Sequence, residues 1–152
     1  MAFVNYYNYI NKIGDYEVKI SEDIKDTIHK NINEIANIIY NNANNKAEFH
    51  YSIQRYLCGM SIEYKLKSSK EYQMICGKLQ GRIDVVWENN DNTIVCVIEI
   101  DSCRRLKSIR KLKSINAVNK IWIVYTENIE DLMEIHDKEK EIYVINLGKL
   151  IF

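Results

Sequence analysis

The stretch Gly81-Arg82-Ile83-Asp84-Val85-Val86-Trp87, followed after a polar turn by Thr93-Ile94-Val95-Cys96-Val97-Ile98-Glu99-Ile100-Asp101-Ser102, decides the fold class of this chain. Both segments are rich in β-branched residues, and the turn between them is rich in asparagine. This combination predicts two antiparallel strands joined by a short connection. Each predicted strand is interrupted by carboxylates, and a buried strand rarely contains a carboxylate that has no ion-pair partner or metal.

The carboxylates of these two strands are expected to lie close together. Glu99 and Asp101 are two residues apart, so they share one face of their strand. A turn centred near Asn90 places Asp84 almost opposite Glu99. Like charges facing each other across a strand pair are destabilising, and a divalent cation held by oxygen ligands would relieve them. The alternative is a structural ion-pair network with Arg82, Lys78 or Arg104.

The rest of the chain predicts an α/β domain. Isoleucines recur at helical spacing after Ser21, which we interpret as an N-cap. The order of elements predicts a mixed central sheet, with an antiparallel strand meander flanked by helices. The expected helices are 5–13, 22–40, 46–58, 103–116 and 128–136, and the expected strands are 61–67, 71–76, 82–87, 93–101, 121–125 and 142–145. We interpret residues 1–152 as a single domain, in which 1–42 is a helical segment packed on the core and 46–126 holds the motifs.

Composition and charge restrict the function classes. The chain has 152 residues, is 47% hydrophobic and 28% charged, and has a formal net charge of zero. The overall charge therefore predicts no partner, and any affinity for nucleic acid must come from a local patch. We find no apolar run of membrane-spanning length and no signal-peptide pattern. With cysteines that lack metal-type spacing, this indicates a cytoplasmic protein that does not insert into membranes.

Residues 104–113 form a basic segment with six Lys or Arg residues and no acidic residue. On a helix that begins just after the carboxylate strand, this segment would present cations beside the acids. Such an arrangement suits a phosphate backbone. The alternative is an ordinary solvated helix face, where most basic clusters lie. The residues expected to contact nucleic acid are Arg104, Arg105, Lys107, Arg110 and Lys111.

The motifs from 46 to 126 resemble those of the PD-(D/E)XK nuclease superfamily, which has a restriction-endonuclease-like or Holliday-junction-resolvase-like fold. Gly81-Arg82-Ile83-Asp84 looks like the Asp-bearing strand of that family, and Ile98-Glu99-Ile100-Asp101 looks like its motif strand. One departure matters: the usual lysine two residues after the second acid is Asp101 here. Some members have an acidic residue at this position, and in others a neighbouring element supplies the basic group.

The resemblance implies a metal-dependent DNA endonuclease that hydrolyses phosphodiester bonds. It implies a Mg²⁺ or Mn²⁺ cofactor, with Asp84, Glu99 and Asp101 as catalytic residues and metal ligands. Glu48 stands where many members keep an additional metal-site acid. Lys107 is our first choice for the missing catalytic lysine, and Arg104 is the second.

The resemblance also implies duplex or branched DNA as the partner and a homodimer as the assembly. Two alternatives stay open. One is a catalytically inactive nucleic-acid-binding module of the same fold. The other is a protein-interaction α/β domain, whose acids form salt bridges.

Overall fold

The computed structural model describes residues 6–76, 79–127 and 141–152, and within the first helix it describes side chains from Asp23 onward. The expected helix at 128–136 lies outside the described residues. The helices are α1 (Tyr6–Asn42), α2 (Lys46–Met60) and α3 (Leu106–Ser114), with a short 3₁₀ helix at Ser61–Tyr64. The strands are β1 (Lys67–Cys76), β2 (Leu79–Glu88), β3 (Ile94–Asp101), β4 (Asn119–Val124) and β5 (Ile142–Asn146).

The strands form one five-stranded mixed sheet in the order β1-β2-β3-β4-β5. β1, β2 and β3 are an antiparallel meander, whereas β3, β4 and β5 are parallel to one another. β3 therefore has an antiparallel neighbour on one side and a parallel neighbour on the other. The predicted α/β class with a mixed sheet is confirmed.

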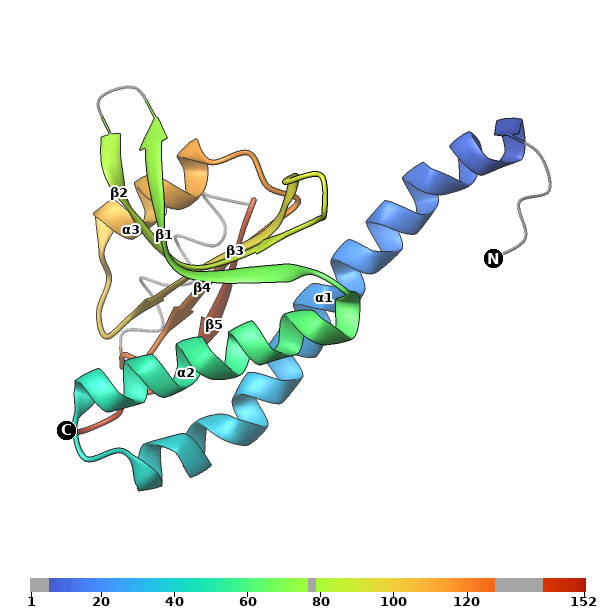
Figure 1. Cartoon of the computed structure of the whole chain (residues 1–152). Coiled ribbons are helices and arrows are strands. Elements are labelled where there is room, and N and C mark those ends of the chain that lie inside the picture. The colour runs from blue at the N-terminus through green and yellow to red at the C-terminus, as the bar shows by residue number, and fades with distance from the viewer. Residues whose placement is uncertain (1–5, 77–78, 128–140) are drawn as a thin grey trace.

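The helices cover both faces of the sheet (Figure 1). One core lies between the sheet and helices α1 and α2, and it includes Phe49, Trp87 and Ile98. The other core lies under α3 and includes Ile109, Leu112 and Trp122. Both tryptophans are fully buried, as their apolar strand contexts predict.

The helix predicted at 22–40 is confirmed, but it is part of a longer one. Ile24, Ile28 and Ile32 recur once per turn and are fully buried. The separate helix at 5–13 and the N-cap at Ser21 are wrong, because α1 runs through both without a break. The chain contains no proline, and serine is tolerated inside a helix. No helix in the described part of the chain has the length and apolarity needed to cross a membrane.

The strand predicted at 61–67 is also wrong. Alternating Ile62, Tyr64 and Leu66 imitate a strand, but the C-terminal end of α2 tightens into the 3₁₀ helix instead. The Ser61 hydroxyl donates to the carbonyl of Cys58 at 2.7 Å, and Lys65 ends the turn in the left-handed region with φ 57°. Strand β1 therefore begins only at Lys67.

Candidate functional site

The β1–β2 hairpin bends at one point, and this point holds two carboxylates. The two strands pair regularly at Lys70 with Val85 and at Tyr72 with Ile83. Between these pairs Glu71 has a φ of 51°, which is uncommon for a residue other than glycine. Ile83 packs in the core under α3, whereas Val85 packs in the core under α1 and α2. In a regular strand, residues two apart have their side chains on the same face. Ile83 and Val85 do not, so the alternation of side chains along β2 is interrupted at Asp84.

β2 and β3 separate beside Asp84, and carboxylates bind the backbone there. The pairing places Val85 opposite Ile98, so the next position outward brings Asp84 opposite Glu99. The Asp84 amide lies 3.4 Å from Oε2 of Glu99, and the Ile100 amide donates to Oδ2 of Asp84 at 2.8 Å. The predicted juxtaposition of these two acids is confirmed.

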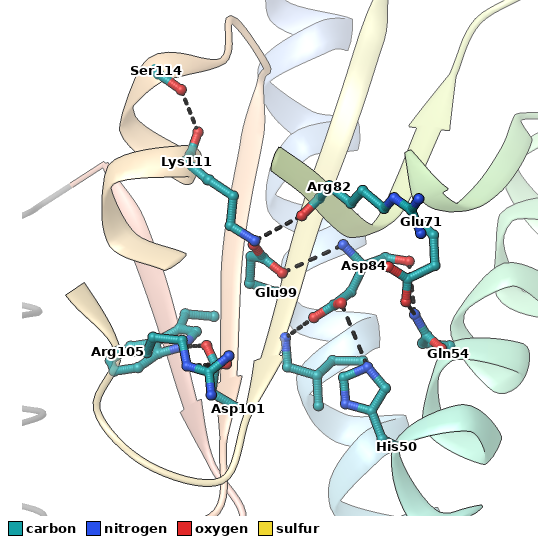
Figure 2. Close-up of polar contacts among 12 residues, drawn as sticks. His50, Gln54, Glu71, Arg82, Asp84, Glu99, Asp101, Arg105, Lys111 and Ser114 are labelled. Carbon is teal, nitrogen blue, oxygen red and sulfur yellow. Dashed lines mark hydrogen bonds and ion pairs between the residues drawn. The ribbon is translucent and has the colours of Figure 1, made fainter. Parts of the chain in front are cut away.

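Lys111 of α3 reaches this pair from the side of the sheet that α3 covers (Figure 2). Its ammonium group forms an ion pair with Glu99 and donates to the carbonyl of Arg82 at 2.7 Å. The lysine side chain is 12% exposed and that of Glu99 is 2% exposed. Gly81 leaves room for the lysine stem, since a Cβ at that position would lie 3.1 Å from Cδ of Lys111.

Asp101 lies on the same side of the sheet as Glu99, but its carboxylate contacts other groups. The indole Nε1 of Trp122 donates to its Oδ2 at 2.8 Å. The Nε atom of Arg105 lies 3.8 Å from its other oxygen, on a side chain that is 63% exposed. Asp101 itself is 7% exposed. The buried indole therefore orients this carboxylate, and the exposed guanidinium adds little to stability.

Helix α2 contributes two side chains on the opposite side of Asp84 (Figure 2). Nε2 of His50 lies 3.5 Å from Oδ1 of Asp84. The amide of Gln54 donates to Oε1 of Glu71 at 2.9 Å and to the backbone carbonyl of Asp84 at 3.1 Å. Gln54 is 4% exposed, so it fills the place where the two strands bend. Ligand atoms of His50, Glu71 and Asp84 all lie within 4.8 Å of one another.

The two central carboxylates have opposite pKa shifts. Burial and the adjacent Asp84 carboxylate raise the pKa of Glu99 to about 9, although Lys111 opposes the shift. Burial also acts to raise the pKa of Asp84, but hydrogen bonds with His50, Glu99 and the Ile100 amide lower it overall. The hydrogen bond to Asp84 raises the pKa of His50 against the effect of burial. The two carboxylates of Asp84 and Glu99 therefore share a proton at pH values well above the one at which an exposed glutamate loses its proton.

The structure brings some of the predicted site residues together and places others outside. Asp84, Glu99 and Lys111 meet, whereas Lys107, our first choice for the catalytic lysine, is exposed. Arg104 lies before α3 begins, and Arg104, Arg105 and Arg110 are exposed.

Glu48, predicted as a metal ligand, caps a helix. Its carboxylate accepts from the Asn44 amide at 2.8 Å, while its own amide donates to Oδ1 of Asn45 at 2.9 Å. Asn45 is the N-cap of α2, and the Glu48 carboxylate binds the backbone N–H of the residue before it, so the arrangement resembles a capping box without being reciprocal. Helix capping therefore accounts for Glu48 without a metal, and the ligand role stays a prediction.

From the sequence, His50 and Gln54 were interpreted as surface or packing residues, and Glu71 was missed. His50 and Gln54 are four residues apart, so the helix predicted at 46–58 already placed them on one face. The signal for Glu71 was an acid within a strand otherwise rich in polar residues, which is too weak to single it out.

Comparison of this chain with protein-family models, with curated proteins and with solved structures found no match.

Proposed function

We propose that this protein is a metal-dependent DNA endonuclease with a restriction-endonuclease-like fold of the PD-(D/E)XK superfamily. The observation that carries the proposal is the ammonium group of Lys111, which reaches Glu99 from α3 and lies beside the Asp84–Glu99 pair. The family motif places a lysine two residues after the second acid, where this chain has Asp101. Lys111 brings the same chemical group to the same carboxylates from another element.

The donor set at this point suits a hard divalent cation. Asp84 and Glu99 offer carboxylate oxygens, the ligands that Mg²⁺ and Mn²⁺ prefer. The Asp84 side chain is 14% exposed, so a small ion can reach it. When bound, such a cation would supply charge for the attacked phosphate and acidify a water molecule. Asp101, which Trp122 orients, acts as a third ligand or positions that water.

Lys111 stabilises the phosphate in this proposal. Its stem is held beside Gly81, and its ammonium group donates to the Arg82 carbonyl. With Asp84 and Glu99 holding a cation, Lys111 would no longer be needed to balance Glu99, and its ammonium group would be free to bind a phosphate oxygen. Fixed positive groups aimed at developing charge are the main source of rate in such reactions.

The exposed basic residues before and on α3 hold the DNA backbone. Arg104, Lys107 and Arg110 are exposed close in sequence to Lys111, so they extend the positive surface outward from the acids. Contacts of this kind position a duplex or branched DNA without reading its sequence. We further propose a homodimer, which would cut two strands with two equivalent sites.

Two measurements on the same samples test the proposal. The first is cleavage of duplex, branched and single-stranded DNA with Mg²⁺, Mn²⁺ or EDTA. The second is the melting temperature, which either cation should raise because it binds the folded state. Asp84→Asn and Glu99→Gln should abolish both the cleavage and the rise. Absence of cleavage by the wild-type protein would contradict the proposal and favour the inactive nucleic-acid-binding module.

A structural role for the acids is the second candidate, and one observation favours it. Each acid has a basic partner: Lys111 for Glu99, His50 for Asp84 and Arg105 for Asp101. A protein-interaction domain would use such pairs to hold the strands. It predicts strong destabilisation by both Asp84→Asn and Glu99→Gln, because each change breaks a buried pair. The nuclease proposal predicts little destabilisation, since the changes relieve repulsion.

A further inference from the structure

We infer that His50, Glu71 and Asp84 form a binding site for a divalent transition-metal cation, with the imidazole of His50 as a ligand. The three side chains come from α2, β1 and β2 and meet at the bend of the hairpin. The inference shares Asp84 with the proposed nuclease centre, but it does not require that the protein cuts DNA. It adds two ligands that the nuclease motif does not include.

The distances suit a site that closes around an ion. Ligands bound at about 2.1 Å and at right angles lie about 3 Å apart. The His50 nitrogen and the Asp84 oxygen are 3.5 Å apart, and all three ligand atoms fall within 4.8 Å of one another. The three groups are therefore close enough for side-chain rotations to bring them to one cation.

Gln54 holds two of the three ligand residues in place through hydrogen bonds. It is 4% exposed and binds one oxygen of Glu71, which leaves the second oxygen of that carboxylate for a cation. It also binds the Asp84 carbonyl, so it connects the two strands that carry the acidic ligands. Hydrogen bonds of this kind orient metal ligands and commonly affect metal affinity strongly.

The imidazole decides which cation the site prefers. Mg²⁺ takes oxygen ligands and keeps much of its water, whereas Mn²⁺ and the later first-row cations also accept imidazole nitrogen. A set of one histidine and two carboxylates therefore favours Mn²⁺ over Mg²⁺. It leaves coordination positions for water or for an oxygen of a ligand.

The alternative role for His50 is that of a protonated partner of Asp84. A protonated imidazole holds the carboxylate but has no lone pair for a metal. The two roles give different results when Mn²⁺ is added, because only a ligand brings its nitrogen into contact with the ion.

The test uses the metal-free chain of residues 1–152 without DNA. Calorimetric titration with Mn²⁺ and with Mg²⁺ should show that the wild-type protein binds Mn²⁺ at least about tenfold more tightly. His50→Gln should remove this preference, and Glu71→Gln should weaken Mn²⁺ binding at least about tenfold. His29→Gln is the matched control, since that histidine contacts Tyr143 instead, and it should bind Mn²⁺ like the wild type. No binding of Mn²⁺ by the wild-type protein, a Mn²⁺ preference that survives in His50→Gln, or an unchanged Mn²⁺ affinity in Glu71→Gln would overturn the inference.

A second measurement needs no variant. Electron spin-echo spectroscopy of Mn²⁺ bound to wild-type protein, with ¹⁵N-labelled histidine, should show coupling between the ion and one imidazole nitrogen. Bound Mn²⁺ without this coupling would overturn the inference, whether or not the protein cleaves DNA. Coupling in a protein that cleaves no DNA would instead contradict only the nuclease proposal.

Discussion

The two sides of Asp84 differ in how their charges are balanced. On the α3 side, Glu99 is 2% exposed and already has the ammonium group of Lys111. On the α2 side, His50 is 29% exposed and Asp84 is 14% exposed, and Gln54 leaves one oxygen of Glu71 for another ligand. The first side already contains a basic group, whereas the second side contains ligand atoms without a strong basic partner. A single carboxylate thus belongs to two environments.

The difference shows that burial alone does not identify a cation site. The most buried acid of this cluster is Glu99, yet it has the strongest basic partner. The more open side gathers donors from three elements, which is what a removable ion requires. Changes on the two sides should therefore have different consequences, and they provide ways to test the comparison.

The largest effect is expected from Lys111. Lys111→Ala should lower the rate of cleavage at saturating DNA by about a hundredfold or more, the usual scale for losing one fixed electrostatic stabiliser. Lys107→Ala, one helical turn earlier and exposed, should weaken DNA binding more than it lowers the rate. Single-turnover cleavage of both variants measures this. A larger loss of rate in Lys107→Ala than in Lys111→Ala would contradict the assignment.

The next effect concerns the exposed basic residues. Replacing Arg104, Lys107 and Arg110 with serine should lower DNA affinity about tenfold or more at low salt. It should also flatten the dependence of log K on log salt by about 0.9 for each phosphate that is no longer neutralised. All DNA sequences should be affected alike. Titrations of labelled duplexes at several salt concentrations measure this. The control combines Lys30→Ser, Lys46→Ser and Lys65→Asn, which removes three exposed charges elsewhere and should keep both affinity and slope.

A further effect, on stability rather than on DNA cleavage, is expected from pH, and it distinguishes the two acids. The folded-state pKa of Glu99 is raised to about 9, so the folded protein binds more protons than the unfolded one above the ordinary glutamate pKa. The stability of the metal-free protein should therefore fall as pH rises from 5.5 to 8.5, by up to about 1.4 kcal/mol per pH unit for one proton. The raised pKa of His50 acts in the same direction above its ordinary value.

Urea unfolding in EDTA at several pH values measures this dependence. Glu99→Gln should remove most of the slope, because the titrating group is gone, and His50→Gln should remove only part of it. The lowered pKa of Asp84 has the opposite sign and costs stability only at acid pH. A stability that is flat across this range in the wild-type protein would mean that Lys111 balances Glu99 completely.

The smallest effect is expected from Gly81. A Cβ there would come 3.1 Å from Cδ of Lys111, so Gly81→Ala should displace the lysine stem and lower cleavage a few-fold, with a change in stability of about 1 kcal/mol or less. Gly59→Ala is the control, because a Cβ at that helical position meets nothing within 4 Å. The control should cleave normally and be slightly more stable.

The parts of the fold that follow from local patterns were predictable. Isoleucine spacing identified the helix around Ile24, Ile28 and Ile32, and β-branched residues identified β3 and β4. The 3₁₀ helix at Ser61–Tyr64 was not predictable, because its alternating apolar residues fit a strand equally well. The length of α1 was missed because a capping residue such as Ser21 is also acceptable within a helix.

The site was predictable only where one turn fixed the geometry. The short connection between β2 and β3 determined the register, so Asp84 and Glu99 were placed together correctly. Which basic residue of the 104–113 segment reaches Glu99 depended on how α3 lies over the sheet. A helix that connects two parallel strands runs back along them, so a later helix residue lies over an earlier strand residue. Lys111 therefore meets Glu99, while Arg105 stays near Asp101.

The close approach of Gly81 and Lys111 has a consequence for recognising relatives of this chain. In the proposed nuclease, the lysine would stand twelve positions after Glu99 rather than two, and the glycine stands three positions before Asp84. A motif search that requires the nearer lysine would pass over any protein built this way. In an alignment, positions 81 and 111 should vary together: a larger residue at the first should accompany loss of the lysine at the second.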